Sequence, residues 1–306
     1  MSVGILWAEP RSPQAQAIED LFSSTLILCG VIFAVVTVLV AWAVFKFRDD
    51  GKRKASQIEG HTRLEIGWTL VPLLIVAGLL VFTVRAVSAS DPPPDREPDL
   101  VVTAHQWWWS VKYKSGAIAA NEIHIPVGKP LVVGIESADV IHDFWVPDLA
   151  RKIDAVPGRS VTIWMQADNP GTYLGACAEY CGAQHAWMRI LVVADSPEDF
   201  AAWEKKQLAP PPEPMTESTL HGLELFDKMT CVKCHAIGPG GATVAPDLTH
   251  IASRKTLGAG VIDNTPENLT RWLKHPGEVK PGCHMPDAQL SDQDAADFVA
   301  YFETLQ

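Results

Sequence analysis

Charge is missing from two long stretches near the start of this 306-residue chain. No charged side chain lies between Asp20 and Lys46, and a second uncharged run covers residues 66–84. Each run is long enough to cross a hydrocarbon core of about 30 Å as a helix. A helix that is apolar on every side is also rare at the surface of a soluble domain. The sequence therefore predicts two membrane-spanning helices, with two buried core helices as the alternative.

Basic residues are scarce before the first run, where Arg11 is the sole one. The connection at 46–63 instead carries six Lys or Arg residues against three acidic ones. The positive-inside rule then places this connection in the cytoplasm, and both termini outside, with everything after Val87 on the outer side. Because no basic leader region precedes the first run, we interpret it as a retained anchor rather than a cleaved signal peptide.

Cysteine is also rare, with six residues, but two of them share a short segment with other soft metal ligands. Cys177, Cys181, His185 and Met188 fall within twelve residues. Thiolate, imidazole and a weak thioether are the ligands that select electron-transfer copper. Two cysteines four residues apart can turn both sulfur atoms to one point, and His142 supplies a second imidazole. We therefore favour a binuclear copper centre. The alternatives are a disulfide, a zinc site and unrelated buried residues.

Two further cysteines form a C-x-x-C-H sequence with Cys231, Cys234 and His235, which is the signature of covalent heme attachment. The thiols would hold the heme and the histidine would ligate its iron. Met285, which is followed by proline, is the predicted sixth ligand, because a His/Met pair raises the reduction potential of an electron carrier. His284 is the weaker candidate for that position. Zinc binding or a chance occurrence is the alternative for the whole motif.

Heme attachment of this kind takes place outside the bacterial cytoplasmic membrane, which agrees with the predicted orientation. We therefore expect a multi-pass protein of that membrane, in contact with lipid, whose metal domains face the periplasm. Cys29 lies in the first apolar run, and Cys283 has no role that the sequence suggests. The formal charge of −11 suggests a basic partner or face. No nucleic acid is expected among the partners.

Proline-rich stretches at 91–98 and 208–218 separate the outer part of the chain into two regions. Short β-branched runs between turn residues predict a β-sandwich or barrel in the first region. These predicted strands are 100–104, 123–128, 131–135, 160–165 and 189–193. The soft-ligand segment precedes the last strand, and we place His142 in an earlier loop.

The second outer region is predicted to be helical, with helices at 218–229 and 266–274 and a C-terminal helix opened by a capping box at Ser291–Asp294. Five parts of the chain follow from these patterns. They are an outer segment 1–20, a transmembrane hairpin 21–90, a copper domain 91–207, a proline-rich linker 208–217 and a heme domain 218–306.

Six short segments add a family resemblance that covers nearly the whole chain. The segments are 64–72, 105–110, 146–149, 154–159, 245–250 and 264–269. The first four resemble subunit II of heme–copper cytochrome c oxidases, and the last two resemble the cytochrome c that is fused to it in caa-type oxidases. The resemblance implies a cupredoxin-like β-sandwich for the copper domain and an all-α class I cytochrome c for the heme domain.

The resemblance also implies roles for individual residues. Its binuclear CuA centre would take side-chain ligands from His142, Cys177, Cys181, His185 and Met188. Glu179 would add its backbone carbonyl and reach a magnesium ion at the border with subunit I through its carboxylate. Trp107 matches the tryptophan through which cytochrome c delivers electrons, and Glu65 matches a carboxylate at the mouth of a proton path. By composition alone, Trp107 is a packing residue and Glu65 complements its helix dipole.

The implied function is that of an oxidase subunit that accepts electrons. A donor would reduce heme c, which would reduce CuA, and subunit I would convert oxygen to water with proton pumping. Expected partners are subunits I and III, and a soluble cytochrome c or a quinol:cytochrome c reductase complex as donor. A CuA-containing subunit of a nitric oxide reductase and a membrane-tethered copper-delivery protein are the alternatives. Quinol oxidases keep a similar subunit without the copper ligands.

Overall fold

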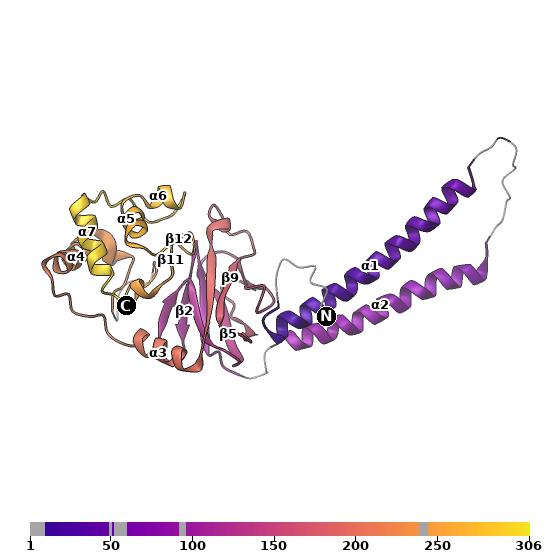
Figure 1. Cartoon of the computed structure of the whole chain (residues 1–306), viewed down its shortest axis with the longest axis horizontal. Helices are drawn as coiled ribbons and strands as arrows, with labels where there is room; N and C mark the ends of the chain where they lie inside the picture. Colours follow the sequence, from indigo (N-terminus) through magenta and orange to yellow (C-terminus); the bar gives the residue numbers. More distant parts are fainter. Residues whose placement is uncertain (1–9, 49–50, 52–59, 92–95, 239–243) are drawn as a thin grey trace. The chain divides into compact units, whose positions relative to one another are not determined.

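The computed structural model describes residues 10–48, 51, 60–91, 96–238 and 244–306 (Figure 1). Much of the predicted segment 1–20, most of the basic connection at 46–63, and residues 92–95 of the first proline-rich stretch lie outside the described residues. The chain divides into two compact units. One contains Gln16–Asp91, and the other contains Pro10–Ala15 together with the chain from Pro92 onward.

Two long apolar helices make up the described part of the first unit. They are α1, Pro13–Lys46, and α2, Thr62–Ser90, and both predicted apolar runs lie within them. Both helices are long and apolar enough to cross a membrane, and the most apolar window of each has no residue buried by protein. Large apolar side chains on all sides, such as Phe33 and Phe82, are instead exposed. The predicted pair of N-terminal membrane-type helices is confirmed.

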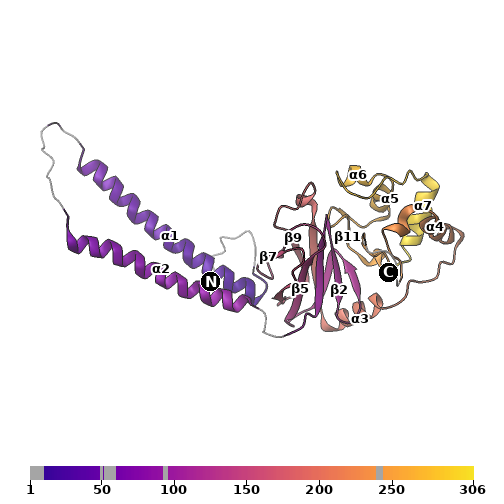
Figure 2. The ribbon, with the colours of Figure 1, turned by 180° about the vertical axis from the view of Figure 1, so that it is seen from behind.

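The copper domain is a sandwich of two five-stranded sheets, as predicted from the strand pattern (Figure 2). The first sheet has the order β3-β2-β1-β5-β8 and the second has the order β4-β10-β9-β6-β7. The strands are β1 Leu100–His105, β2 Trp108–Tyr113, β3 Ile118–Ala120, β4 Glu122–Pro126, β5 Leu131–Ser137, β6 His142–Trp145, β7 Ile153–Ala155, β8 Val161–Met165, β9 Gly171–Cys177 and β10 Arg189–Asp195.

Side chains from both sheets meet in one apolar core. Val102 and Ile135 of the first sheet, and Phe144 and Ile190 of the second, belong to the same buried cluster. Alternating burial along β1 and β9 reflects the two-residue period of a strand, so that one face of each sheet points inward. Strand pairs β1–β5 and β4–β10 are parallel, and the other ladders of the two sheets are antiparallel.

Two features of this domain differ from the sequence-based expectations. His142 is the first residue of β6 and does not lie in a loop, because its backbone pairs with Ala155 of β7. A helix that we did not anticipate, α3 at Pro197–Gln207, follows β10. Ser196 caps it by accepting a hydrogen bond from the Asp199 N–H. The helix lies beside β4 and β10 and packs Trp203 onto the core.

In its described residues, the heme domain contains helices and one short ribbon formed by β11, Thr256–Leu257, and β12, Ile262–Asp263. Its helices are α4 Glu217–Lys228, α5 Pro266–Lys274, α6 Pro276–Val279 and α7 Asp292–Phe302, with short 3-10 turns η2 Thr230–Lys233 and η3 Ile251–Ser253. Helices α4 and α7 approach closely at Gly222, where an added Cβ would lie 2.4 Å from the Asp297 carbonyl oxygen. A side chain at position 222 would therefore force the two helices apart.

The predicted capping box at the start of α7 is half formed. Ser291 accepts a hydrogen bond from the Asp294 N–H, but the Asp294 carboxylate accepts one from the Ser291 hydroxyl rather than from a backbone N–H. A reciprocal capping box instead opens α4, between Thr216 and Thr219. Threonine serves there in the position that glutamate or glutamine usually takes, because its hydroxyl can also accept a backbone hydrogen bond.

Candidate metal centres

Cysteine, histidine and methionine side chains gather at one end of the second sheet of the sandwich. His142 opens β6, Cys177 closes the neighbouring strand β9, and the two strands are paired through Phe144 and Cys177. Met188 immediately precedes β10, and its carbonyl accepts a hydrogen bond of 2.9 Å from the Cys177 N–H. Cys181 lies in the connection between β9 and β10 and is buried like the others. Three neighbouring strands thus hold the predicted copper ligands at a common edge.

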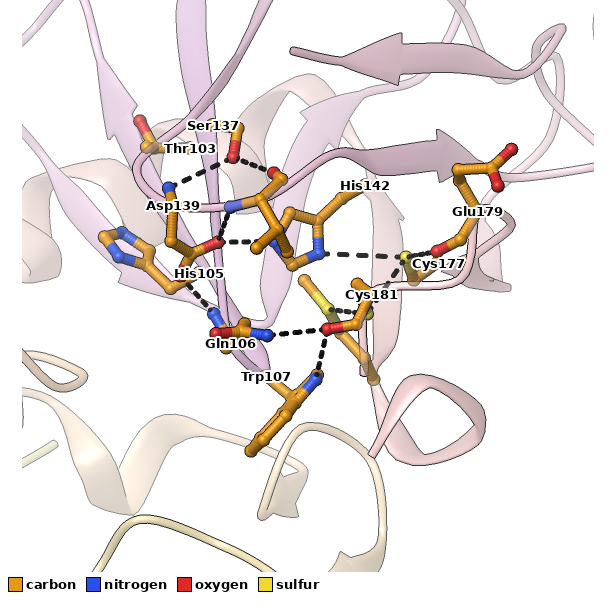
Figure 3. A network of polar contacts seen from close by, with 12 residues as sticks. Thr103, His105, Gln106, Trp107, Ser137, Asp139, His142, Cys177, Glu179 and Cys181 are labelled. Atoms are coloured by element: carbon orange, nitrogen blue, oxygen red, sulfur yellow. Dashed lines mark hydrogen bonds and ion pairs between the residues drawn. The ribbon is translucent and has the colours of Figure 1, made fainter. Parts of the chain in front are cut away.

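The side chains of His142, Cys177 and Cys181 point toward one another (Figure 3). The two sulfur atoms of Cys177 and Cys181 are 3.7 Å apart. The Nδ1 atom of His142 lies 3.9 Å from the Cys177 sulfur, and Nδ1 of His185 lies 3.8 Å from the Cys181 sulfur. The thioether of Met188 is 3.9 Å from the same sulfur.

Sulfur and imidazole nitrogen bind first-row metal ions such as zinc at about 2.0–2.3 Å, so two donors on one tetrahedral ion are about 3.3–3.8 Å apart. The observed spacings fall at or just beyond the top of this range. The donor atoms of His142, Cys177 and Cys181 all lie within 4.8 Å of one another. His185 lies beside Cys181, whereas His142 lies beside Cys177. One imidazole at each end of two central sulfur atoms is an arrangement that fits two ions.

Asp139 holds the imidazole of His142 in a fixed orientation. Its Oδ1 atom lies 2.7 Å from His142 Nε2, which leaves Nδ1 directed at Cys177 (Figure 3). Metal-ligating histidines usually have such a partner on the second ring nitrogen, which fixes the tautomer. Asp139 is itself tied by backbone N–H groups of Gln106, at 2.7 Å, and of Val140, at 2.6 Å. Asp139 is a further site residue that the sequence could have indicated, because an acidic residue three positions before a candidate ligand is a detectable signal.

Hydrogen bonding sets the protonation of the sulfur pair. The hydrogen bond between Cys177 and Cys181 lowers the pKa of Cys177 and raises the pKa of Cys181, since one thiol stays protonated beside a thiolate. Burial opposes protonation of His142, but hydrogen bonds with Cys177 and Asp139 outweigh it and raise the pKa of this imidazole. Thiolate is the form that binds metal, so Cys177 is prepared as a ligand. Loading an ion would release the remaining protons.

Glu179 presents its two functional groups in different directions. Its carbonyl oxygen lies 3.1 Å from the Cys177 sulfur, within the ligand cluster. The residue also lines a pocket of about 410 Å³ together with Asp143, Asp154 and Arg159. Burial, and then a hydrogen bond with Asp154, raises the pKa of Asp143 to about 7. Among the described residues, Glu179 is not part of a group of three clustered metal ligands.

Trp107 lies against the backbone of the copper-ligand segment. Its Nε1–H donates to the Cys181 carbonyl oxygen at 3.0 Å, and the Gln106 side chain donates to the same oxygen at 2.7 Å. Gly182 permits this approach, because an added Cβ would lie 3.0 Å from the indole and its φ of +118° disfavours other residues. The indole is therefore directly linked to a ligand residue as well as packed in the core.

The predicted heme attachment residues meet in and just after the η2 turn. The His235 N–H donates to the Cys231 carbonyl at 2.9 Å, which folds the motif into a tight loop. Nδ1 of His235 lies 2.7 Å from the Pro246 carbonyl oxygen, so that Nδ1 carries the proton and Nε2 is the nitrogen suited to iron. Burial lowers the pKa of His235 and keeps it neutral. Met285 and Cys231 both pack on the heme-domain core.

Glu65 lies in the first turn of α2. Its carboxylate accepts a hydrogen bond of 3.1 Å from the backbone N–H of His61, the residue that precedes the helix. This contact satisfies one of the unpaired donors of a helix N-terminus. The geometry is that of a helix-capping carboxylate, and a role in proton uptake stays a prediction.

Two polar residues that the sequence analysis did not identify connect the two metal domains. Gln184, one residue before His185, donates to the carbonyl oxygens of Lys280 at 3.2 Å and of Pro281 at 2.9 Å. The ammonium group of Lys280 donates to the Trp107 carbonyl oxygen at 2.9 Å. Both side chains are almost fully buried. No local sequence signal distinguishes them, because the contacts join segments about a hundred or more residues apart.

Comparison with known proteins assigns three regions of the chain to families. Residues 1–85 match the cytochrome c oxidase subunit II transmembrane domain, and residues 117–195 match its periplasmic domain. Residues 220–306 match the cytochrome c family. The three matched regions follow the order of the apolar helices, the β-sandwich and the helical domain.

Full-length relatives give the same assignment. Cytochrome c oxidase subunit 2 of Alkalihalophilus pseudofirmus is 34% identical, over 97% of this chain and 90% of its own length. The subunit of the same name from Bacillus subtilis is 30% identical, over 97% of this chain and 91% of its own. A crystal structure of the periplasmic domain of subunit II of cytochrome oxidase from Bradyrhizobium japonicum is 34% identical, covers 37% of this chain and 99% of that chain, and has a TM-score of 0.35.

Proposed function

Because this chain belongs to the cytochrome c oxidase subunit II family, as a member with a C-terminal cytochrome c domain, we propose that it carries electrons from an external donor through heme c and a binuclear CuA centre to subunit I. The single observation that carries this proposal is the pair of buried sulfur atoms of Cys177 and Cys181, 3.7 Å apart. Each has an imidazole nitrogen within 3.9 Å, from His142 and His185 respectively. A mononuclear site would not require two central thiolates between two imidazoles.

The copper pair would be held by side chains of the two cysteines, the two histidines and Met188, and by the Glu179 carbonyl. When bound, it supplies a site that takes up and releases one electron shared between two ions. The protein keeps the ligands in place: Asp139 orients His142, while Gln106 and Trp107 both bind the Cys181 carbonyl oxygen. These fixed contacts limit the movement of ligands between redox states, which favours electron transfer over ligand exchange.

Heme c would be attached through Cys231 and Cys234, with His235 and Met285 as axial ligands. The hydrogen bond from His235 to the Pro246 carbonyl oxygen supports this assignment, because it leaves Nε2 as the unprotonated nitrogen. The partly buried position of Met285 against the heme-domain core also supports it. His284 is exposed, which makes it the weaker candidate for the sixth position.

We propose that α1 and α2 cross the bacterial cytoplasmic membrane, with both termini and both metal domains on the periplasmic side. The bias of basic residues toward the connection between the two helices supports this orientation. The helices would then contact lipid and subunit I, and subunit III would complete the assembly. Glu65 would lie at the cytoplasmic end of α2, where a carboxylate could serve proton uptake for pumping. The Glu179 carboxylate would reach magnesium at the border with subunit I.

A soluble cytochrome c or a quinol:cytochrome c reductase complex would donate the electrons. Nitric oxide reductases with a CuA-containing subunit remain the alternative within the enzyme class, and the active-site metal of the partner subunit distinguishes them. A copper-delivery protein would need no heme domain, and this chain carries one.

Metal analysis and spectroscopy of the purified complex test the proposal directly. We expect two copper ions and one covalent heme on this chain, a seven-line mixed-valence EPR pattern, and a c-type absorption band beside the hemes of subunit I. One copper ion per chain, or one tightly held zinc ion, would refute the binuclear assignment. Oxygen consumption that needs a reduced c-type donor would identify the complex as an oxidase, whereas reduction of nitric oxide in place of oxygen would favour the alternative.

A further inference from the structure

A buried lysine of the heme domain binds the backbone of the copper domain. Lys280 is 4% exposed, and its ammonium group donates to the Trp107 carbonyl oxygen at 2.9 Å. A second buried donor comes from the copper domain. Gln184 of the copper-ligand segment is 1% exposed and donates to the carbonyl oxygens of Lys280 and Pro281. These three hydrogen bonds, here called the docking contact, join the Lys280–Pro281 segment of the heme domain to two segments of the copper domain, at Trp107 and at Gln184.

The docking contact positions the segment that leads into the predicted heme ligand. His284 lies one residue before Met285, and its imidazole is centred 4.8 Å from the indole of Trp107. That indole is 9% exposed and donates to the Cys181 carbonyl oxygen. A continuous series of contacts therefore runs from the residue before one predicted ligand to the backbone of another.

We propose that Lys280 and Gln184 are positioning residues that hold the fused heme domain on Trp107 and close this tryptophan to separate donor proteins. The proposal rests on the proposed function and specifies its internal route. With heme held by Cys231, Cys234 and His235 and copper held by Cys177 and Cys181, the step served would transfer one electron from the reduced heme to the oxidised copper pair, a one-electron oxidation balanced by a one-electron reduction. No bond forms or breaks. External donors would then deliver electrons to the heme domain and not to the copper domain.

The physical cost of burying Lys280 supports a positioning role. A buried ammonium group is unfavourable unless it is hydrogen-bonded, and burial lowers the pKa of Lys280 to about 8. At pH 7 the group is therefore still mostly protonated and needs its acceptor. Separation of the two domains would hydrate the ammonium group but expose the indole of Trp107. Hydrogen bonds are directional, so the docking contact favours one orientation of the heme domain on the copper domain, in addition to the apolar packing on Trp107.

A buried carboxylate of the copper domain binds a second segment of the heme domain. Glu122 of β4 is 3% exposed and accepts hydrogen bonds from the backbone N–H groups of Lys255, at 2.8 Å, and Thr256, at 3.0 Å. Nearby, the Arg189 N–H donates to the Ala259 carbonyl oxygen at 3.1 Å. Two separate segments of the heme domain are therefore bound to the sandwich, which restricts rotation about either contact alone.

Substitution of Lys280 in the complete oxidase tests the proposal. Lys280→Met keeps an unbranched side chain that is one atom shorter and removes the donor, while Lys228→Met removes an exposed lysine of the same domain and serves as the control. Two measurements are made on protein whose copper EPR pattern and heme spectrum match those of the wild type. One is hydrogen exchange of the peptides that cover 182–187 and 280–284. The other is the rate of copper reduction after flash reduction of heme c.

For Lys280→Met we expect exchange in both peptides to become about tenfold faster and the internal rate to fall about tenfold, because a hydrogen bond to a charged group is lost. Lys228→Met should change neither. Gln184→Met removes the contact from the copper side and should give the same pair of effects, which keeps the test available if Lys280→Met does not load its metals. Unchanged exchange and unchanged rates in both variants would overturn the proposal.

The same experiment separates this proposal from the proposed function. If the wild-type complex moves no electrons from heme c to copper, the proposed function fails whatever the variants do. If wild-type transfer is rapid and the variants match it, only the positioning role fails. A soluble c-type cytochrome that reduces copper in wild type before heme c would also overturn the closure of Trp107.

Discussion

The indole N–H of Trp107 donates to the carbonyl oxygen of Cys181 at 3.0 Å. Cys181 is one of the two cysteines whose sulfur atoms form the centre of the copper-ligand cluster. The tryptophan therefore reaches the metal site through a backbone group of a ligand residue. The indole also packs against His284 of the heme domain, the residue before the predicted ligand Met285, with ring centres 4.8 Å apart.

Replacement of Trp107 by phenylalanine should slow copper reduction from both internal and external donors by a similar factor. The change removes the N–H donor, a loss of about 0.5–1.5 kcal/mol, while Gln106 still binds the Cys181 carbonyl oxygen. Stopped-flow reduction with a soluble c-type cytochrome and flash reduction of heme c would measure the two rates. Slower transfer from the soluble donor alone would instead show that the tryptophan serves outside partners and not heme c.

Cys181→Ser should abolish the seven-line copper EPR pattern and leave the heme spectrum unchanged. Serine cannot supply the soft thiolate that lies between Cys177, His185 and Met188. Copper content should fall below two ions per chain in the same preparation. Cys283→Ser provides the matched control, because that thiol lies outside both ligand sets and its loss should affect neither signal. Retention of the pattern in Cys181→Ser would show that this sulfur does not bridge copper.

Asp139→Asn should weaken copper binding by about 10–100-fold, the usual effect of losing the partner of a ligating histidine. The amide can no longer accept a charge-assisted hydrogen bond from His142 Nε2. Competition with a copper chelator measures the affinity. Asp195→Asn is the control. Asp195 Oδ2 lies 2.6 Å from Nδ1 of His124, and this histidine is not one of the predicted copper ligands. Equal copper affinities for wild type and Asp139→Asn would show that Asp139 does not support copper binding by His142.

Much of this arrangement could be predicted from the sequence because its signals are local. The uncharged runs gave both membrane-type helices, and the predicted strand at 131–135 lies within β5. The loop predicted for His142 is wrong, because its backbone pairs with Ala155 of a distant strand, and a long-range pairing of this kind leaves no local signal. Gln184 and Lys280 required the structure. Their partners lie on other elements, and a single polar residue carries no mark of the backbone group that it will bind.

Met285→Ala should lower the reduction potential of heme c and abolish the weak near-infrared band that arises from sulfur bound to ferric iron. Among the described residues between α6 and α7, only Cys283 and Met285 carry sulfur, and Met285 is the one with a thioether. Absorption spectra of the oxidised complex and a redox titration provide the measurements. His284→Ala should keep the band and the potential. Survival of the band in Met285→Ala would assign the sixth position to another residue.

Asp297 should make the stability of the heme domain depend on pH. Its carboxylate in α7 accepts hydrogen bonds from the Ser218 hydroxyl and from Nδ1 of His221, at 2.8 Å, both in α4. Hydrogen bonding from Ser218, and then from His221, lowers the pKa of Asp297, and the same contact raises the pKa of His221. The carboxylate therefore stabilises the fold above its unfolded pKa of about 3.9, and this contribution is lost as the pH falls through its lower folded value.

The histidine has the opposite dependence, because its charged form contributes below about pH 6.5 and is lost as the pH rises through the raised folded value. The link between α4 and α7 should thus be strongest between about pH 4 and pH 6.5. In that range, Asp297→Asn should lower the thermal midpoint of the heme-loaded protein by about 4–8 °C, followed by heme absorbance. The difference from wild type should shrink as acid protonates Asp297. Asp287→Asn, which affects an exposed pair with His275, should cause little change. A difference that persists undiminished in acid would mean that the asparagine disturbs packing and that the charge of Asp297 is not the cause.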